Sequence, residues 1–155
     1  MISKPLAVFI CGVLNPIFSV LILEEVLLAP SLNRWLHTII FWGKTLLALG
    51  SAVGLAELSK AKEFWPGHPF FPSGHTTFAV SAATCLILQR GNRWAWLTVP
   101  MAFMMMFYLV VGKFHTWDEV AGGTILGISF PIMVWKLFPS QPISPTKGDL
   151  IDSVE

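Results

Sequence analysis

Two short polar segments of an otherwise apolar chain carry the side chains that could do chemistry. The first reads Pro72, Ser73, Gly74, His75 and stands directly before an apolar run rich in small residues. Pro72 restricts the residue before it and Ser73 is a favoured N-cap, so the segment predicts a helix start. The first turn of such a helix presents unpaired N–H groups and the positive end of the helix dipole, which together bind phosphate.

Within this turn, Gly74 and His75 have properties that an anion site would use. Gly74 lets a ligand approach the backbone closely. His75 could donate a proton to a leaving oxygen. The alternative is an ordinary capped helix with an interfacial histidine, and a short motif by itself does not separate the two interpretations.

The second segment, residues 112–123, places one histidine near two carboxylates. Asp118 follows His115 by three residues and Glu119 follows it by four. If the segment begins a helix, either carboxylate lies beside the imidazole. A carboxylate that holds one ring nitrogen leaves the other free as a nucleophile or base. The alternative is a polar interfacial turn whose acids stabilise a helix N-terminus.

Basic side chains near both segments could neutralise phosphate oxygens. Lys60 and Lys62 precede His68 and the first segment, and Lys113 precedes His115. Each lysine offers a point charge to an anion. The alternative is that they simply extend to the lipid head groups, as lysines beside a membrane span commonly do.

The composition indicates a membrane protein. Of the 155 residues, 54% are hydrophobic and 12% are charged, with a mean hydropathy of +0.67. Soluble domains carry about 25% charged residues. Five apolar stretches approach the length of about 20 residues that crosses a bilayer as a helix. They are residues 6–28, 36–58, 73–89, 94–112 and 120–138.

We therefore predict an all-α integral membrane bundle of about five transmembrane helices. A single domain covers residues 1–139, and a polar, disordered tail covers residues 140–155. In the last span, Gly123 and Gly127 form a small-xxx-small pair that allows close helix contact. The net charge of +1 lacks the basic excess that a nucleic-acid surface needs.

Counting the spans places both polar segments at one membrane surface. If the five helices cross in sequence, His68, His75 and His115 all lie on the same side. The number of basic residues differs little between the two sides of the membrane, so it does not orient the chain by itself. Discounting the lysines that could serve a ligand puts the histidines on the extracytoplasmic side, and we expect a bacterial inner membrane protein. The oligomeric state is left open.

In this order the segments resemble the type-2 phosphatidic acid phosphatase superfamily, membrane lipid phosphate phosphatases related to the vanadium haloperoxidases. That family has a lysine before an Arg-Pro pair, then Pro-Ser-Gly-His, then a Ser-Arg pair followed by a histidine and an aspartate. Residues 72–75 match the second part in full. In the third part, His115 stands at the position of the family's histidine and Glu119 at that of its aspartate.

The chain departs from the family pattern at two arginines. His68 and Ala61 stand where the first part has its arginine and lysine, and Tyr108 and Leu109 stand where the third part has Ser-Arg. Arginine's forked donors are not replaced one-for-one by a lysine such as Lys113. The chain also has five predicted spans where the family commonly has six. These departures bear on the rate of a reaction more than on the fold.

The resemblance implies a metal-free phosphatase, without a cofactor, that hydrolyses a lipid phosphate or diphosphate such as phosphatidic acid or an isoprenyl diphosphate. His115 would attack phosphorus to form a phosphohistidine, and His75 would protonate the leaving lipid oxygen. Glu119, or alternatively Asp118, would hold the His115 ring. The groups expected to bind the phosphoryl oxygens are Ser73, Gly74, Lys60, Lys62, His68 and Lys113.

Two other functions stay open at this stage. The missing arginines favour a non-catalytic family member that binds phosphate head groups or partner proteins. Alternatively, His68, His75, His115 and a carboxylate would suit a zinc ion. The Pro-Ser-Gly-His context favours the phosphate interpretation over the metal.

Overall fold

The computed structural model of the protein describes residues 4–27 and 32–139, with the side chains of residues 4–23 and 38–139. Within these ranges the chain forms five α-helices and one short 3-10 turn. They are α1 (Lys4–Leu27), α2 (Leu32–Ala61), α3 (Gly74–Arg90), η1 (Asn92–Trp94), α4 (Ala95–Val111) and α5 (Trp117–Leu137). The predicted all-α bundle is confirmed. The polar tail predicted for residues 140–155 lies outside the described residues.

Four of the described helical segments are long and apolar enough to cross a membrane. They are Lys4–Leu23, Thr38–Ala61, Asn92–Val111 and Trp117–Leu137. The remaining predicted span, residues 73–89, corresponds to α3, which has 17 residues. Because α3 contacts α1, α2, α4 and α5, its neighbours shield it from lipid. A helix enclosed in this way can carry buried polar residues such as Thr76, Thr77 and Ser81.

Side-chain caps define where α3 and α5 begin. The Ser73 hydroxyl accepts a hydrogen bond from the Thr76 N–H at 3.4 Å, as its N-cap position predicts. Thr116 caps α5 in a reciprocal capping box with Glu119. This box starts α5 at Trp117, three residues before the predicted span at 120. The second polar segment is therefore the first turn of a helix.

Helices α3 and α5 approach closely because α5 has glycines where the two meet. A Cβ atom on Gly123 would lie 2.6 Å from the carbonyl oxygen of Ser73. One on Gly127 would lie 2.7 Å from the Cβ atom of Val80 and 3.0 Å from the carbonyl oxygen of Thr77. The close contact predicted from the small-xxx-small pair is confirmed.

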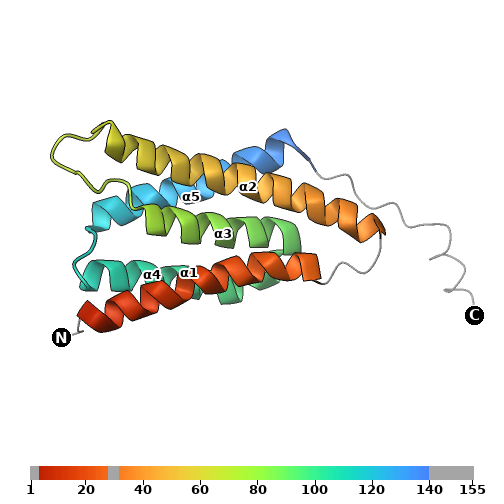
Figure 1. Ribbon diagram of the computed structural model, residues 1–155, viewed down its shortest axis with the longest axis horizontal. Coiled ribbons are helices and arrows are strands. Elements are labelled where there is room, and N and C mark those ends of the chain that lie inside the picture. Colours follow the sequence, from red (N-terminus) through yellow and green to blue (C-terminus); the bar gives the residue numbers. More distant parts are fainter. Residues whose placement is uncertain (1–3, 28–31, 140–155) are drawn as a thin grey trace, which may run out of the picture.

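The helices lie side by side, and three chain segments meet at one end of the bundle (Figure 1). These are the α2–α3 connection, the α4–α5 connection and the N-terminal end of α1. At this end the Ser73 N–H donates a hydrogen bond to the carbonyl oxygen of Glu119 at 2.9 Å. The two polar segments are thus joined directly, backbone to backbone.

Replacing Gly123 by alanine should destabilise the protein, because the new Cβ would meet the Ser73 backbone. We expect the free energy of unfolding to fall by about 1–3 kcal/mol, the usual cost of overpacking. The matched control is Gly54→Ala in α2, where a Cβ meets nothing within 4 Å. This control should be neutral or slightly stabilising, since alanine favours helix. Thermal unfolding in detergent micelles measures both, and equal melting temperatures would contradict the prediction.

Candidate active site

His75 and His115 lie together at the end of the bundle where the two polar segments meet. Their ring centroids are 6.4 Å apart, with an angle of 55° between the planes. His75 is the second residue of α3, and His115 directly precedes the N-cap of α5. A phosphate group can contact both rings at this separation, since each hydrogen bond spans about 2.7–3.2 Å. The convergence predicted by counting spans is confirmed.

Glu119 holds the His115 ring. Its Oε2 atom lies 2.8 Å from His115 Nδ1 and also accepts a hydrogen bond from the Thr116 N–H at 3.1 Å. The side chains of His115 and Glu119 are only 11% and 6% exposed. Because the carboxylate engages Nδ1, Nε2 is the ring nitrogen left for chemistry. Of the two carboxylates considered, Glu119 makes the contact, whereas Asp118 is exposed.

Ser73 organises the turn from a buried position. Its side chain is fully buried, and its hydroxyl accepts from Thr76 Oγ1 at 3.1 Å in addition to capping α3. Its carbonyl oxygen accepts from Thr77 Oγ1 at 2.9 Å. These bonds give Ser73 a structural role in the α3 start. Its direct contact with a phosphate stays a prediction.

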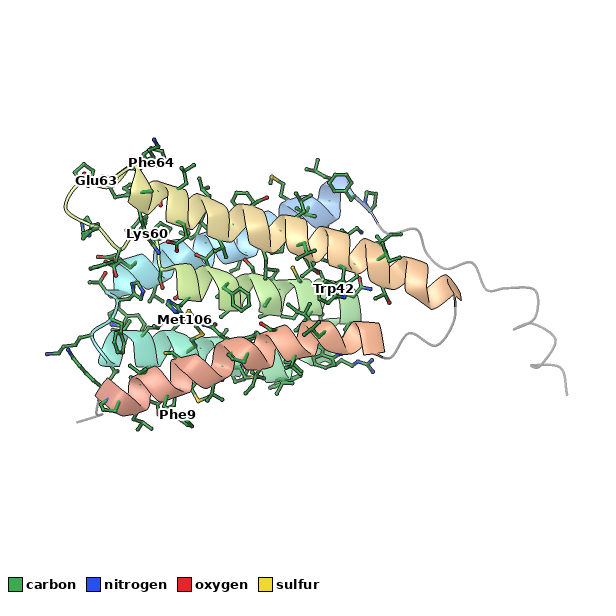
Figure 2. The ribbon with its side chains drawn as sticks, in the orientation of Figure 1. Phe9, Trp42, Lys60, Glu63, Phe64 and Met106 are labelled. Carbon is green, nitrogen blue, oxygen red and sulfur yellow. The ribbon has the colours of Figure 1, made fainter. Side chains whose placement is uncertain are left out.

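Lys60 and Glu57 lie against the first residue of α3. Lys60 Nζ is 2.7 Å from Glu57 Oε1. A Cβ on Gly74 would lie 3.2 Å from Lys60 Nζ and would clash with the Glu57 carboxylate. Figure 2 shows Lys60 between the end of α2 and the start of α3. Sequence reasoning missed Glu57, although its spacing of three residues from Lys60 on one helix was the available signal.

Lys62, His68 and Lys113 are all exposed. His68 lines a separate cavity of about 260 Å³ together with Lys60, rather than the cavity beside His75. Contacts of these three side chains with a ligand stay predictions. Among the described residues, no three His, Cys, Asp or Glu side chains cluster closely enough for a metal ion. The zinc arrangement considered from the sequence is therefore not formed within this part of the chain.

A cavity of about 410 Å³ opens beside both histidines. Apart from the histidines, its lining is mostly apolar and comes from α1, α4 and the two connections. These other lining residues are Val8, Cys11, Gly12, Asn15, Phe70, Leu109 and Phe114. The volume falls within the range of about 300–1,000 Å³ that is typical of small-ligand sites. No motif marks the α1 residues, so sequence reasoning missed them.

The surroundings of His75 favour its neutral form. Partial burial, followed by the charges of His115 and Lys60, lowers the pKa of His75 below its usual value, while Glu57 acts in the opposite direction. The ring lies at the first turn of α3, outside the four apolar spans. Because the usual pKa is 6.5, the unliganded ring is mostly uncharged at neutral pH. A bound anion beside it would raise the pKa again.

These features define a helical membrane protein with a pair of histidines at one end of its bundle, one of which is oriented by a carboxylate. The family model of the PAP2 superfamily matches residues 32–142, which include α2 to α5 and both histidine segments. The chain belongs to the PAP2 superfamily, as the Pro-Ser-Gly-His segment predicted. No curated protein and no solved structure gives a significant match. Family membership indicates a phosphatase-type activity.

The Glu119 carboxylate both contacts His115 and closes the capping box of α5. Two substitutions at this position should therefore differ in their effect on stability. Glu119→Ala removes the side-chain half of the α5 capping box, the bond from the Thr116 N–H, and should lower the free energy of unfolding by about 0.5–1.5 kcal/mol. Glu119→Gln keeps a side chain that can close the box, so it should cost less than about 0.5 kcal/mol. Thermal unfolding of the purified variants measures the difference. Equal losses in the two variants would contradict the prediction.

Proposed function

We propose that the protein hydrolyses a lipid phosphate or diphosphate at the His75–His115 pair through a phosphohistidine intermediate. The observation that carries the proposal is the 2.8 Å contact between Glu119 Oε2 and His115 Nδ1, with the His75 ring on the other side of the same site. A nucleophile oriented by a carboxylate and an adjacent proton donor are the two groups that a phosphoryl transfer through histidine requires.

In the first step, His115 Nε2 attacks phosphorus and forms an N–P bond as the bond from phosphorus to the lipid oxygen breaks. Protonated His75 donates its proton to that oxygen, which leaves as an alcohol or a lipid monophosphate. In the second step, neutral His75 takes a proton from water, whose oxygen attacks phosphorus. Until this point Glu119 stabilises the positive charge of the phosphorylated His115 ring. The N–P bond then breaks, its electron pair returns to Nε2, and inorganic phosphate leaves.

The phosphoryl oxygens would be bound mainly by the first turn of α3 and by Lys60. That turn offers the N–H groups of a helix start, and Gly74 adds no side chain of its own there. Lys60 Nζ lies beside Gly74 and brings a positive charge close to the same turn. Ser73, Lys62, His68 and Lys113 would add contacts only after rearrangement of their side chains. Preorganised charge of this kind carries most of the rate in phosphoryl transfer.

The position of the site at the end of the bundle suits a substrate held by the bilayer. The head group would enter at the membrane surface, while its apolar tail stays among the helices. We place this surface on the extracytoplasmic side of a bacterial inner membrane, because discounting the lysines that could serve the ligand leaves more basic residues on the opposite side.

A second candidate function is binding of phosphate head groups without turnover. Lys60 is paired with Glu57, and the two family arginines are replaced by His68 and Leu109. Both features lower the positive charge available to a transition state. Binding and hydrolysis make opposite predictions for the assay that follows.

Purified protein in detergent, with a chelator present, is expected to release phosphate from phosphatidic acid or an isoprenyl diphosphate. His115→Ala should lower kcat/KM by at least about a thousandfold, as loss of a nucleophile does. The matched control is His37→Ala in α2, about 34 Å along that helix from Lys60. Binding without turnover would support the second candidate. Activity that appears only with added metal would overturn the proposed mechanism.

The lowered pKa of His75 predicts a particular pH dependence. Because His75 must be protonated to act as the acid, kcat/KM should fall as pH rises through its pKa in the free protein, which lies below the usual 6.5. Bound phosphate raises that pKa, so the falling limb of kcat should lie at higher pH than that of kcat/KM. The measurement is a pair of pH–rate profiles. An unchanged falling limb in His75→Asn would exclude His75 as the acid.

A further inference from the structure

One wall of the cavity beside the histidines is built by α1, the helix that precedes the residues matched by the PAP2 family. Four α1 residues line it, at the spacing i, i+3, i+4, i+7 of a single helix face. They are Val8, Cys11, Gly12 and Asn15. Helix α1 therefore presents one continuous face to the space beside the reacting groups.

Asn15 is the hydrogen-bonding residue of this face. Its Oδ1 atom is buried and has no hydrogen-bond partner among the residues that the structure describes. Leaving such an atom unpaired costs about 1–3 kcal/mol, so a polar group that enters the cavity has a reason to bind there. Rotation of the amide exchanges its oxygen and nitrogen. The side chain can thus accept from a hydroxyl or donate to an ester carbonyl.

Asn15 lies deeper in the bundle than the histidines. Gly112 stands three residues before His115, and a Cβ atom on it would lie 2.8 Å from the Cβ atom of Ala7. The α4–α5 connection therefore lies at the same height along the bundle as Ala7 of α1. From Ala7 to Asn15 the helix rises about 12 Å away from that end of the bundle. A phosphate held between the rings would therefore place the linker and the start of the chain near Asn15, rather than the phosphate itself.

We propose that Asn15 is a specificity-determining residue that hydrogen-bonds the polar linker of the lipid, its ester or hydroxyl groups. The inference rests on the proposed function for the position of the phosphate. The protein then prefers glycerol-linked lipid phosphates to isoprenyl phosphates, whose hydrocarbon chain begins directly after the phosphate and leaves Asn15 unpaired. A site built to hydrogen-bond its substrate discriminates against an analogue that lacks the partner group.

Gly12 keeps the same cavity open. A Cβ at this position meets nothing within 4 Å, although the residue lines the cavity. A leucine there would occupy space without displacing the backbone. Gly12 thus provides a second variant that tests whether the lipid occupies this cavity at all.

The first test compares kcat/KM for a diacylglycerol phosphate and for farnesyl phosphate in the same detergent micelles. Wild-type protein is expected to prefer the diacylglycerol phosphate by at least about tenfold, the equivalent of one good hydrogen bond. Asn15→Leu should lower this ratio by about tenfold, mainly through KM. Val13→Ala, on the exposed side of α1, is the matched control and should keep the ratio. An unchanged ratio in Asn15→Leu, or a wild-type preference for farnesyl phosphate, overturns the proposal.

The second test measures binding of both lipids to the His115→Asn protein by calorimetry, without turnover. Preferential binding of the diacylglycerol phosphate that is lost with Asn15→Leu supports the proposal, even if the wild-type protein releases no phosphate and hydrolysis fails. Turnover of both lipids without dependence on Asn15 supports hydrolysis and overturns this inference.

Gly12→Leu should weaken binding of both lipids, with Gly54→Leu as its control. Unchanged binding in Gly12→Leu means that the lipid does not enter the cavity, and it also overturns the proposal.

Discussion

The hydrogen bonds of Glu119 hold the two histidine segments in one arrangement. Its carboxylate contacts His115 Nδ1 and the Thr116 N–H, and its backbone carbonyl accepts from the Ser73 N–H. A carboxylate as buried as this one is stable only when such partners compensate for lost hydration. The same bonds start α5, orient the His115 ring and anchor the turn that carries His75. Fold and chemistry at this end of the bundle therefore depend on one side chain and its own peptide group.

The site contains little free positive charge for the phosphate that we propose it binds. Lys60 shares its charge with Glu57, and His75 is mostly neutral until an anion arrives. The start of α3 would compensate in part, since a helix start offers backbone N–H groups to an anion and Lys60 Nζ lies beside it. In the mechanism that we propose, the bound anion would raise the pKa of His75 and so favour the proton that the reaction needs.

The period of a helix predicted that a carboxylate of the α5 start lies beside His115, but it left Asp118 and Glu119 both open. The family resemblance favoured Glu119, which makes the contact. Helix counting likewise predicted that both histidine segments share one side, since it requires only span lengths. The Glu57 partner of Lys60 was missed although its spacing on the same helix was readable. That the pair lies against Gly74 could not be predicted, because it depends on how α2 is rotated about its axis against α3. Asn15 was missed for a related reason. Which face of α1 turns toward the cavity is decided by packing against α3 and α4, and no motif records it.

The polar interior of α3 has a consequence for how the chain enters a membrane. This helix has 17 residues and buries hydroxyl side chains in its first half, so it is poorly suited to leave the translocon for lipid by itself. Its neighbours, by contrast, are long and apolar enough to cross a membrane. Biogenesis would then be ordered, with α3 retained at the insertion machinery until α5 emerges and offers the glycine face against which it packs.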